Sequence, residues 1–458
     1  MRILHYSLGF PPYRSGGLTK FCVDLMEEQS RGGHEVSLLW PGKMLSIHRN
    51  TYIKEHKKYG EIGSFEVYNP TPISYDEGII DIELFMAYGN KQIYKKFLNK
   101  LQVDVLHIHT LMGLHKGMLD AANELSIKMI FTAHDFFPIC PKVTMYRNGV
   151  ICDDIDNCSS CASCNMSALS INKIKILQSG MYRSLKDSFL IKAIRKKHRD
   201  NYLSEENSTN VRCQRTDRNR KDYKELRQYY NSLLRCMDVI HYNSTITKHV
   251  YEKYLDLRCV KTEVIAISHS NIRDCRKKKD YKDSTLRLTY LGPAGSGKGY
   301  FLIKEGLDNL WNDLGKRQDF EWDNFKLNVF FAPKDKSDYM HIGERYTYSQ
   351  LEKIFDETDV LIVPSVWYET FGYTVIEALS YGVPVIISGT VGARDVLQND
   401  SGIIIEDITS VKLADTVRRL TKCKLRRMNE NILSMQKIMT ISDMNGLIYE
   451  KCYKTESD

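Results

Sequence analysis

No apolar run in this 458-residue chain reaches the roughly 18 residues that a membrane-spanning helix needs, so no such span is expected. A secretory leader is not expected either, because the apolar stretch at residues 1–6 is interrupted by polar residues and soon meets Pro11-Pro12. That stretch predicts the first strand of a βαβ unit instead. Twelve cysteines without an export signal indicate reduced thiols and not a disulfide framework. These features predict a cytoplasmic protein.

Recognised nucleic-acid-binding modules are absent too, so the net charge of +8 does not predict a nucleic-acid partner. Nearly all of that excess lies in residues 181–230, which hold 14 Lys/Arg against 7 Asp/Glu. Residues 171–190 place apolar side chains at mostly helical spacing among lysines and arginines. A basic amphipathic helix of this kind can lie on an anionic membrane surface, which predicts peripheral attachment to the inner face of the plasma membrane. The alternative is a solvated helix that caps the N-terminal domain.

The length of the chain is too great for one compact core and predicts two domains of ordinary size. Apolar runs alternate with helical patterns in both halves, which predicts an α/β fold of two Rossmann-like domains. We expect the first domain at residues 1–268, with a basic, cysteine-containing insert at about 140–235, and the second at 285–440. Strands are expected at residues 2–7, 34–39, 105–109 and 129–133, and then at 286–291, 327–331, 360–363, 385–387 and 403–405, with a helix at about 17–31.

The segment from Glu369 to Glu377 places two carboxylates eight positions apart across a predicted loop-to-helix junction. Unpaired N–H groups at the start of that helix, near Gly372, can take an anion such as a diphosphate. A carboxylate would repel a diphosphate, so hydroxyl groups are its natural partners. Glu377 is placed to accept hydrogen bonds from a ribose diol, and Glu369 to hold the hydroxyls of a transferred sugar or to stabilise positive charge at its anomeric carbon. The other interpretation makes one glutamate a helix-start charge and the other a surface residue.

A glycine-rich loop follows the predicted strand at 286–291 and matches most of a Walker A phosphate-binding pattern. Its sequence is Gly292-Pro293-Ala294-Gly295-Ser296-Gly297-Lys298-Gly299. The pattern fails at its last position, because Gly299 stands where a Ser or Thr would reach magnesium. No paired metal-binding Asp ends a convincing second strand, so an NTP hydrolase is disfavoured. A diphosphate-binding loop and a merely flexible turn remain as interpretations.

These segments, with further motifs, resemble the retaining glycosyltransferases of family 4, which carry a Glu-x7-Glu signature and have the GT-B fold. The resemblance thus implies two Rossmann-like domains facing a cleft. The resemblance runs over nearly the whole chain. It is carried by Pro11-Pro12, Gly16-Gly17, Gly33-His34-Glu35-Val36, Asp104-Val105-Leu106-His107-Ile108-His109 and Thr132-Ala133-His134-Asp135, and then by Pro364-Ser365, Glu369, Phe371-Gly372, Glu377-Ala378-Leu379, Gly382-Val383-Pro384-Val385 and Gly392.

The resemblance implies a nucleoside diphosphate sugar as donor and a hydroxyl of a glycan or lipid-linked molecule as acceptor, with no cofactor required for catalysis. The destination implied is a cell-surface polysaccharide. Lys298 would neutralise the leaving diphosphate, while Glu369 and His134 would face the transferred sugar. The implied donor-binding residues are Gly16, Gly17, Gly292, Phe371, Gly372, Tyr373, Thr374 and Glu377.

The chain departs from the family in the glycine-rich loop before Lys298. Family members usually have an Arg shortly before the Lys, whereas Leu291-Gly292-Pro293 offers none. His109 is a second candidate for the rim of the cleft, and His107 is expected to face the packed side. A helix within residues 441–458 is expected to return to the first domain, as it does in that fold.

Five cysteines fall within 25 residues and allow two interpretations. They are Cys140, Cys152, Cys158, Cys161 and Cys164, the last three at Cys-x2-Cys-x2-Cys spacing. A structural zinc site is one interpretation, because four thiolates suffice, and free thiols are the other. Neither gives this cluster a part in the chemistry.

Two other functions remain open. The missing Arg allows a catalytically inactive partner subunit that binds a nucleotide sugar without turning it over. A nonhydrolysing sugar epimerase shares the architecture, but the Glu-x7-Glu segment and the basic insert disfavour it.

Overall fold

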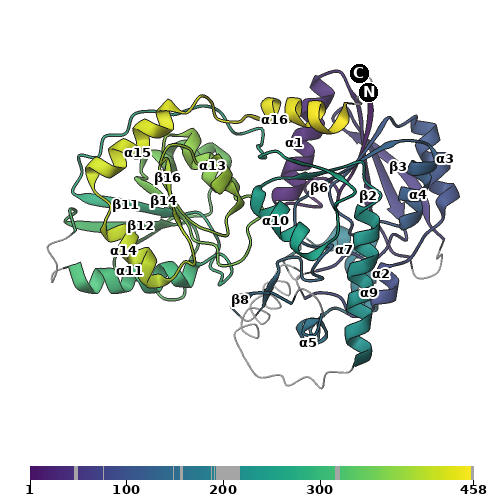
Figure 1. Ribbon diagram of the computed structural model, residues 1–458, viewed down its shortest axis with the longest axis horizontal. Helices are drawn as coiled ribbons and strands as arrows, with labels where there is room; N and C mark the ends of the chain where they lie inside the picture. The colour runs from purple at the N-terminus through teal and green to yellow at the C-terminus, as the bar shows by residue number, and fades with distance from the viewer. Residues whose placement is uncertain are drawn as a thin grey trace.

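The computed structural model describes residues 1–45, 50–75, 77–147, 149–154, 158–186, 188–189, 191, 217–314 and 320–454. Much of the basic segment predicted at 181–230 therefore lies outside the described residues. The chain forms two α/β domains side by side, each built on a sheet whose strands are mostly or entirely parallel, which confirms the predicted fold class (Figure 1). Among the described helices, none has both the length and the apolarity to cross a bilayer.

The first domain is built on an eight-stranded sheet in the order β10-β9-β6-β5-β1-β2-β4-β3. Its strands are β1 (Arg2–Tyr6), β2 (Glu35–Pro41), β3 (Tyr52–Tyr59), β4 (Ile62–Tyr68), β5 (Val105–Ile108), β6 (Lys128–Ala133), β9 (Val239–Tyr242) and β10 (Lys261–Val264). All pairs are parallel except β3 with β4. The main helices are α1 (Gly17–Arg31), α2 (Ile82–Phe85), α3 (Lys91–Leu101), α4 (Lys116–Glu124), α9 (Asp217–Leu234) and α10 (Thr245–Tyr254). Because parallel strands end at one edge of the sheet, residues after β1, β5 and β6 are brought together there.

The second domain is built on a six-stranded parallel sheet in the order β13-β12-β11-β14-β15-β16. Its strands are β11 (Thr285–Tyr290), β12 (Asn324–Val329), β13 (Met340–Ile342), β14 (Val360–Val363), β15 (Val385–Ser388) and β16 (Gly402–Ile405). Its helices are α11 (Tyr300–Asp313), α12 (Leu351–Asp356), α13 (Tyr373–Ser380), α14 (Ser410–Arg418) and α15 (Lys422–Ser434), with short 3-10 turns at Tyr348–Gln350 and Gly392–Val396. Since β11 and β14 are neighbours, the loops that follow them lie next to each other.

The chain leaves the second domain at its end and packs again on the first. Helix α16 (Ile441–Ile448) contacts α1, and a π-helical turn at Tyr449–Tyr453 follows it. Figure 1 shows this last segment in yellow beside α1, with the two chain ends close together. Tyr453 is buried, and its hydroxyl oxygen accepts a hydrogen bond of 3.0 Å from Gln29 Nε2. The first domain is thus completed by residues from both ends of the sequence.

One hydrophobic core runs through both domains. The same cluster of buried residues contains Phe21 and Leu25 of α1, Val375 and Leu379 of α13, and Met444 of α16. Burial of such apolar surface stabilises at about 25 cal/mol per Å². The two domains are therefore packed against each other in this structure, and α10 of the first domain contacts the 3-10 turn at Gly392–Val396 of the second.

The helix predicted over residues 171–190 is wrong as one continuous element. Over the described residues 171–186 the structure has two short helices, α6 (Ile171–Leu177) and α7 (Gly180–Leu185). Gln178 turns into the first domain, where its side chain bonds Ile73 N and Gly42 O. Ser179 then caps α7 by accepting a hydrogen bond from Tyr182 N at 3.1 Å. Apolar spacing could not reveal this break, because it comes from a polar side chain and a cap.

Candidate active site

The glycine-rich loop between β11 and α11 packs on the segment that follows β14. Val366 N donates to Gly297 O at 2.9 Å, and Gly299 caps α11 with a φ of +77°. A Cβ at Gly297 would collide with the Trp367 ring, and one at Gly299 with Pro364 O. Glycine is required at these two positions because the loops approach so closely. Gly292 fits closely over the hydroxyl of Tyr290 in the same way.

This packing brings together two residues that sequence analysis predicted to act at one site. The Lys298 ammonium forms an ion pair with Glu369 Oε2, across 71 residues of sequence. It also lies 5.3 Å from the centre of the Trp367 ring, whose Nε1 donates to the same carboxylate oxygen at 3.5 Å. Both charged side chains keep some exposure, 30% for Lys298 and 21% for Glu369. The site therefore holds a cation and a carboxylate that solvent or a ligand can reach.

The loop after Glu369 is held rigidly at its backbone. Glu369 N donates to Thr390 O at 3.1 Å, and Glu369 O accepts from Gly392 N at 2.9 Å. Phe371 is buried in the core and its carbonyl oxygen accepts from Ala393 N at 2.7 Å, so its side chain is not available to a ligand. Gly372 caps α13 with a φ of +99°, and Tyr373 and Thr374 form the first helical positions. Their N–H groups belong to the first turn, which has no intrahelical acceptors and favours an anion.

The start of α1 in the first domain faces the start of α13. Gly16 caps α1 with a φ of +109°, and both Gly16 and Gly17 are exposed. A Cβ added at Gly17 would lie 3.6 Å from the Tyr373 ring. Two helix N-termini from different domains thus converge on one region. Anionic ligands are stabilised where such N–H groups and dipoles meet.

A hydrogen bond joins the Glu369 loop to the end of β6. Thr370 Oγ1 donates to His134 O at 3.1 Å, and Thr370 O accepts from Ser244 Oγ at 2.6 Å. His134 is half-buried, and burial lowers the pKa of its ring to about 3. Burial likewise raises the pKa of the neighbouring Asp135 to about 6. At neutral pH His134 is therefore an uncharged hydrogen-bonding group beside the loop that carries Glu369.

Glu377 has a different partner from Glu369. It is 3% exposed, and its Oε1 forms a 2.9 Å hydrogen bond with Nε2 of the buried His269. The rings of Tyr348 and Tyr373 each lie 5.1 Å from the His269 ring. Sequence analysis did not find His269, because it precedes Glu377 by 108 residues and no motif marks it.

The prediction that His109 lies at the rim of the cleft is wrong. Its side chain is buried and bonds inward to His5 Nδ1 at 2.9 Å, while its own Nδ1 lies 3.2 Å from His134 Nε2. Its strand β5 adjoins β1, so the ring turns to the neighbouring strand and not to solvent. His107 is buried, as expected.

The cysteine cluster is only partly assembled. A hydrogen bond from the Cys161 thiol lowers the pKa of Cys158, while burial raises the pKa of Cys140 to about 12. In the described part of the chain, two groups place three possible metal-ligand atoms within 4.8 Å of one another. One group consists of histidines and the other of histidines with Cys22, so neither contains a cysteine of this cluster. Structural zinc at Cys140–Cys164 thus stays a prediction.

Comparisons with known proteins agree with this geometry. Residues 15–151 match the family model "Glycosyltransferase Family 4", and residues 336–434 match "Glycosyl transferases group 1". The chain is 24% identical to the uncharacterized glycosyltransferase MJ1607 of Methanocaldococcus jannaschii, over 87% of this chain and 83% of that one.

Solved structures show the same fold. An alpha,alpha-trehalose 6-phosphate synthase from Burkholderia multivorans superposes with a TM-score of 0.56 at 13% identity, covering 98% of this chain and 95% of the other. Alr3699/HepE of Anabaena, in complex with UDP and glucose, superposes with a TM-score of 0.52 at 11% identity, covering 98% of each chain.

Proposed function

Because the chain belongs to the family 4, group 1 glycosyltransferases and has their GT-B fold, we propose that it transfers a sugar from a nucleoside diphosphate sugar to a hydroxyl group. The acceptor in this proposal is a glycan or lipid-linked molecule of cell-surface polysaccharide biosynthesis, and the anomeric configuration is retained. The observation that supports it most is the Lys298–Glu369 pair beside two converging helix N-termini.

The proposed mechanism begins with the diphosphate of the donor. It lies against the glycine-rich loop and the first N–H groups of α13, and Lys298 exchanges Glu369 for a phosphate oxygen. The exposed backbone at Gly16 and Gly17 approaches the same group from the first domain. Lys298 and these backbone N–H groups stabilise the negative charge that develops as the diphosphate leaves.

The transfer step breaks the bond between the anomeric carbon and the diphosphate oxygen, and the electron pair leaves with the nucleoside diphosphate. The acceptor oxygen then bonds the anomeric carbon on the same face, and its proton passes to the departing phosphate oxygen. Glu369 and His134 orient the sugar hydroxyls. Glu377, held through one oxygen by His269, offers its carboxylate to the ribose hydroxyls.

A donor screen tests this proposal. Thermal stabilisation is measured with a panel of nucleoside diphosphate sugars that includes UDP-glucose, the ligand class that Anabaena HepE binds. The stabilising donor, labelled in its sugar, is then incubated with membrane and glycan acceptors. Movement of label into an acceptor supports the enzyme, and a protein stabilised by no member of the panel would contradict the proposal.

One sequence feature favours a second function. No Arg stands in Leu291-Gly292-Pro293, so the diphosphate clamp lacks a charge that relatives usually have. A nucleotide-sugar-binding partner subunit without turnover needs no such charge. Tight donor binding without transfer or hydrolysis, with every acceptor tried, would identify this function.

We expect transfer to continue in excess EDTA. The proposed charge stabilisation comes from Lys298 and backbone N–H groups, so a divalent ion is not required. Initial rates are compared with and without EDTA, and after adding magnesium back. A loss of more than about tenfold that magnesium restores would contradict a metal-independent mechanism.

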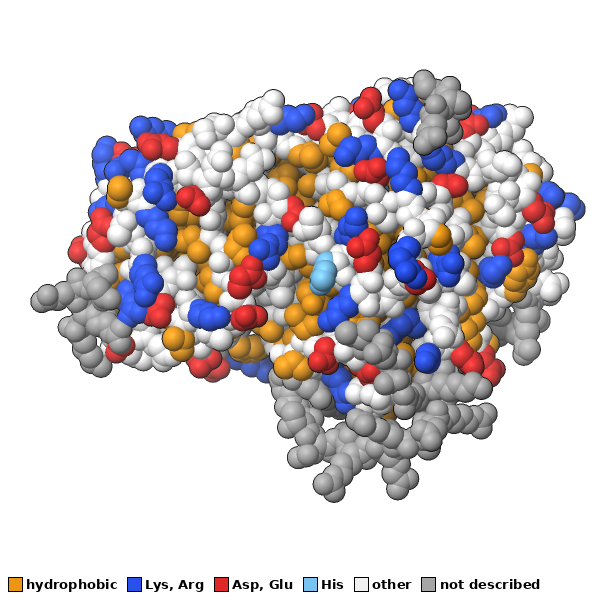
Figure 2. Space-filling view, viewed as in Figure 1, with side chains coloured by type: hydrophobic (Ala, Val, Ile, Leu, Met, Phe, Trp, Pro, Cys, Tyr) orange, Lys and Arg blue, Asp and Glu red, His pale blue; other side chains and the backbone are white. Residues whose placement is uncertain are grey.

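We also propose that α6 and α7 attach the protein to anionic membranes. Arg183 fixes α7 through Glu66 Oε1 at 2.9 Å, while Ile176, Met181 and Leu185 are exposed. The basic residues of α6 are Lys173 and Lys175, whereas the one basic residue of α7 is the Arg183 that pairs with Glu66. Figure 2 shows Lys and Arg interspersed with Asp and Glu over the described part of the face in view.

The double variant Met181→Ser/Leu185→Ser is expected to weaken sedimentation with anionic liposomes by about tenfold, because two apolar side chains no longer enter the interface. Neutralising the basic residues of 171–230 should have the same effect. Val411→Ser is the matched control, since Val411 is equally exposed but lies on α14. If neither the Met181→Ser/Leu185→Ser variant nor the neutralised variant changed sedimentation, attachment through this segment would be excluded.

A further inference from the structure

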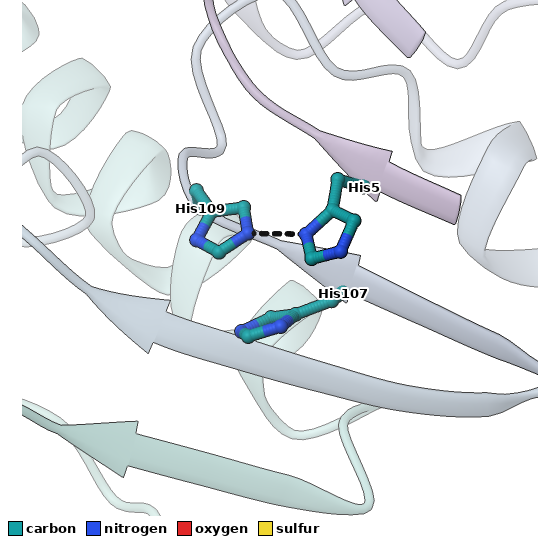
Figure 3. Close-up of side chains that lie close together, drawn as sticks. All are labelled: His5, His107 and His109. Atoms are coloured by element: carbon teal, nitrogen blue, oxygen red, sulfur yellow. Dashed lines mark hydrogen bonds between the residues drawn. The ribbon is translucent and has the colours of Figure 1, made fainter. Parts of the chain in front are cut away.

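A continuous chain of side-chain hydrogen bonds crosses the first domain behind the proposed site. It contains four buried histidines and ends at His134, next to the Glu369 loop. Figure 3 shows its centre, where His5, His107 and His109 converge from the neighbouring strands β1 and β5. Burial lowers the pKa values of His5 and His241 to about 4, so each ring carries a single proton at neutral pH. A neutral ring donates from one nitrogen and accepts at the other.

The direction of the chain is fixed at its far end. His241 Nε2 lies 2.9 Å from Ile265 O, and a carbonyl oxygen can only accept. His241 Nδ1 is therefore an acceptor, and Thr132 Oγ1, at 3.0 Å, must donate to it. The Thr132 hydroxyl has one proton, so its oxygen accepts from His107 Nε2 at 2.7 Å. His107 Nδ1 is consequently an acceptor.

The same logic continues through the C-terminal segment. Tyr453 donates its hydroxyl proton to His107 Nδ1 at 2.6 Å and so accepts from Gln29 Nε2 at 3.0 Å. Gln29 Oε1 then accepts from His5 Nε2 at 2.7 Å. His5 Nδ1 is left to accept from His109 Nε2 at 2.9 Å.

The last hydrogen bond of the chain determines which ring nitrogen of His134 carries the proton. With Nε2 protonated, His109 accepts through Nδ1, so His134 must donate from Nε2 across 3.2 Å. His134 Nδ1 then keeps its lone pair, with no partner from the described part of the protein.

We propose that Thr132 and Tyr453 are positioning residues, which act through the buried histidines to hold His134 with its proton on Nε2 and an acceptor at Nδ1. The acceptor receives a hydroxyl of the transferred sugar, a step that rests on the function proposed above. A ring of opposite tautomer would present N–H to that hydroxyl and would lose the bond to His109.

Metal binding is the competing explanation for this cluster. His5, His107 and His109 place three nitrogens within 4.8 Å of one another. His5 and His107, however, have both ring nitrogens engaged in the chain of hydrogen bonds, and so does His109. A metal ion would displace those partners and leave buried polar atoms unsatisfied, which is costly.

Variants of Thr132 separate positioning from packing. Thr132→Val keeps the volume but removes both hydrogen bonds, and is expected to lower kcat about tenfold with little change in the KM for the donor. Thr132→Ser keeps the hydroxyl and is expected to retain activity within about twofold, although it loses a buried methyl group. If Thr132 served packing alone, Thr132→Ser would lower kcat more than Thr132→Val. Tyr453→Phe breaks the chain at a second point and should resemble Thr132→Val.

The tautomer can be observed without an activity assay. With ¹⁵N-labelled histidine and an assignment from His134→Gln, the wild-type His134 ring should show a protonated Nε2 and a bare Nδ1 from pH 6 to 8. Thr132→Val and Tyr453→Phe should give mixed tautomers. A protonated Nδ1 in the wild type would overturn the proposal, and so would unchanged tautomers in both variants. If the wild type transfers no sugar, the proposed function fails while this measurement still decides the tautomer.

Discussion

Lys298→Ala is expected to lower the turnover number for sugar transfer by about a hundredfold or more, the usual cost of removing one preorganised charge-stabilising group. The variant loses the only side-chain cation that the described residues place against Glu369. It should also bind the nucleoside diphosphate product more weakly, because the product carries the charge that Lys298 neutralises. Steady-state kinetics and titration calorimetry measure the two effects.

Lys304→Ala is the matched control for this variant. Lys304 lies on α11, in the helix that follows the glycine-rich loop, and pairs with Asp308 and not with Glu369. It should keep normal kinetics. Normal turnover by Lys298→Ala would end the assignment of the diphosphate clamp.

Glu369→Gln is expected to reduce turnover by about a hundredfold while nucleoside diphosphate binding becomes tighter. Turnover falls because the amide cannot stabilise positive charge on the sugar. Binding improves because Lys298 no longer has to leave a carboxylate partner, and a partly exposed ion pair contributes about 1 kcal/mol, or about fivefold in affinity. The two substitutions therefore change product affinity in opposite directions.

The control for Glu369→Gln is Glu406→Gln. Glu406 pairs with Arg394 at 2.7 Å, also in the second domain, and is more exposed than Glu369. It should leave both turnover and product affinity unchanged. Weaker product binding by Glu369→Gln would show that Glu369 contacts the nucleotide and not the sugar.

The central strands could be predicted from sequence, because each is a short apolar run ended by a turn. The strand expected at 360–363 matches β14 residue for residue, and the others differ by a few residues at their ends. The hairpin of β3 and β4 was not predicted. Strand β3 is largely exposed and carries charged residues at four of its eight positions, so it has no apolar pattern to detect.

The site was predictable where motifs carry it and not where distant segments meet. Loop glycines and charges in short motifs marked Lys298 and Glu369, and the structure joins them. His269 and the chain from His5 to Tyr453 depend on strand order and on the return of α16. The periodicity of the sequence reveals neither the strand order nor the return of α16, since partners such as Gln29 and Tyr453 are 424 positions apart.

The return of α16 to α1 also determines when the protein can be completed during synthesis. Residues 285–440 contain their own sheet and can fold as they leave the ribosome, whereas the first domain waits for Tyr453. Until that tyrosine arrives, His107 and Gln29 remain without the hydroxyl that joins them. A nascent chain halted before residue 441 would therefore expose an unfinished surface on α1 to chaperones, even though its second domain is already folded.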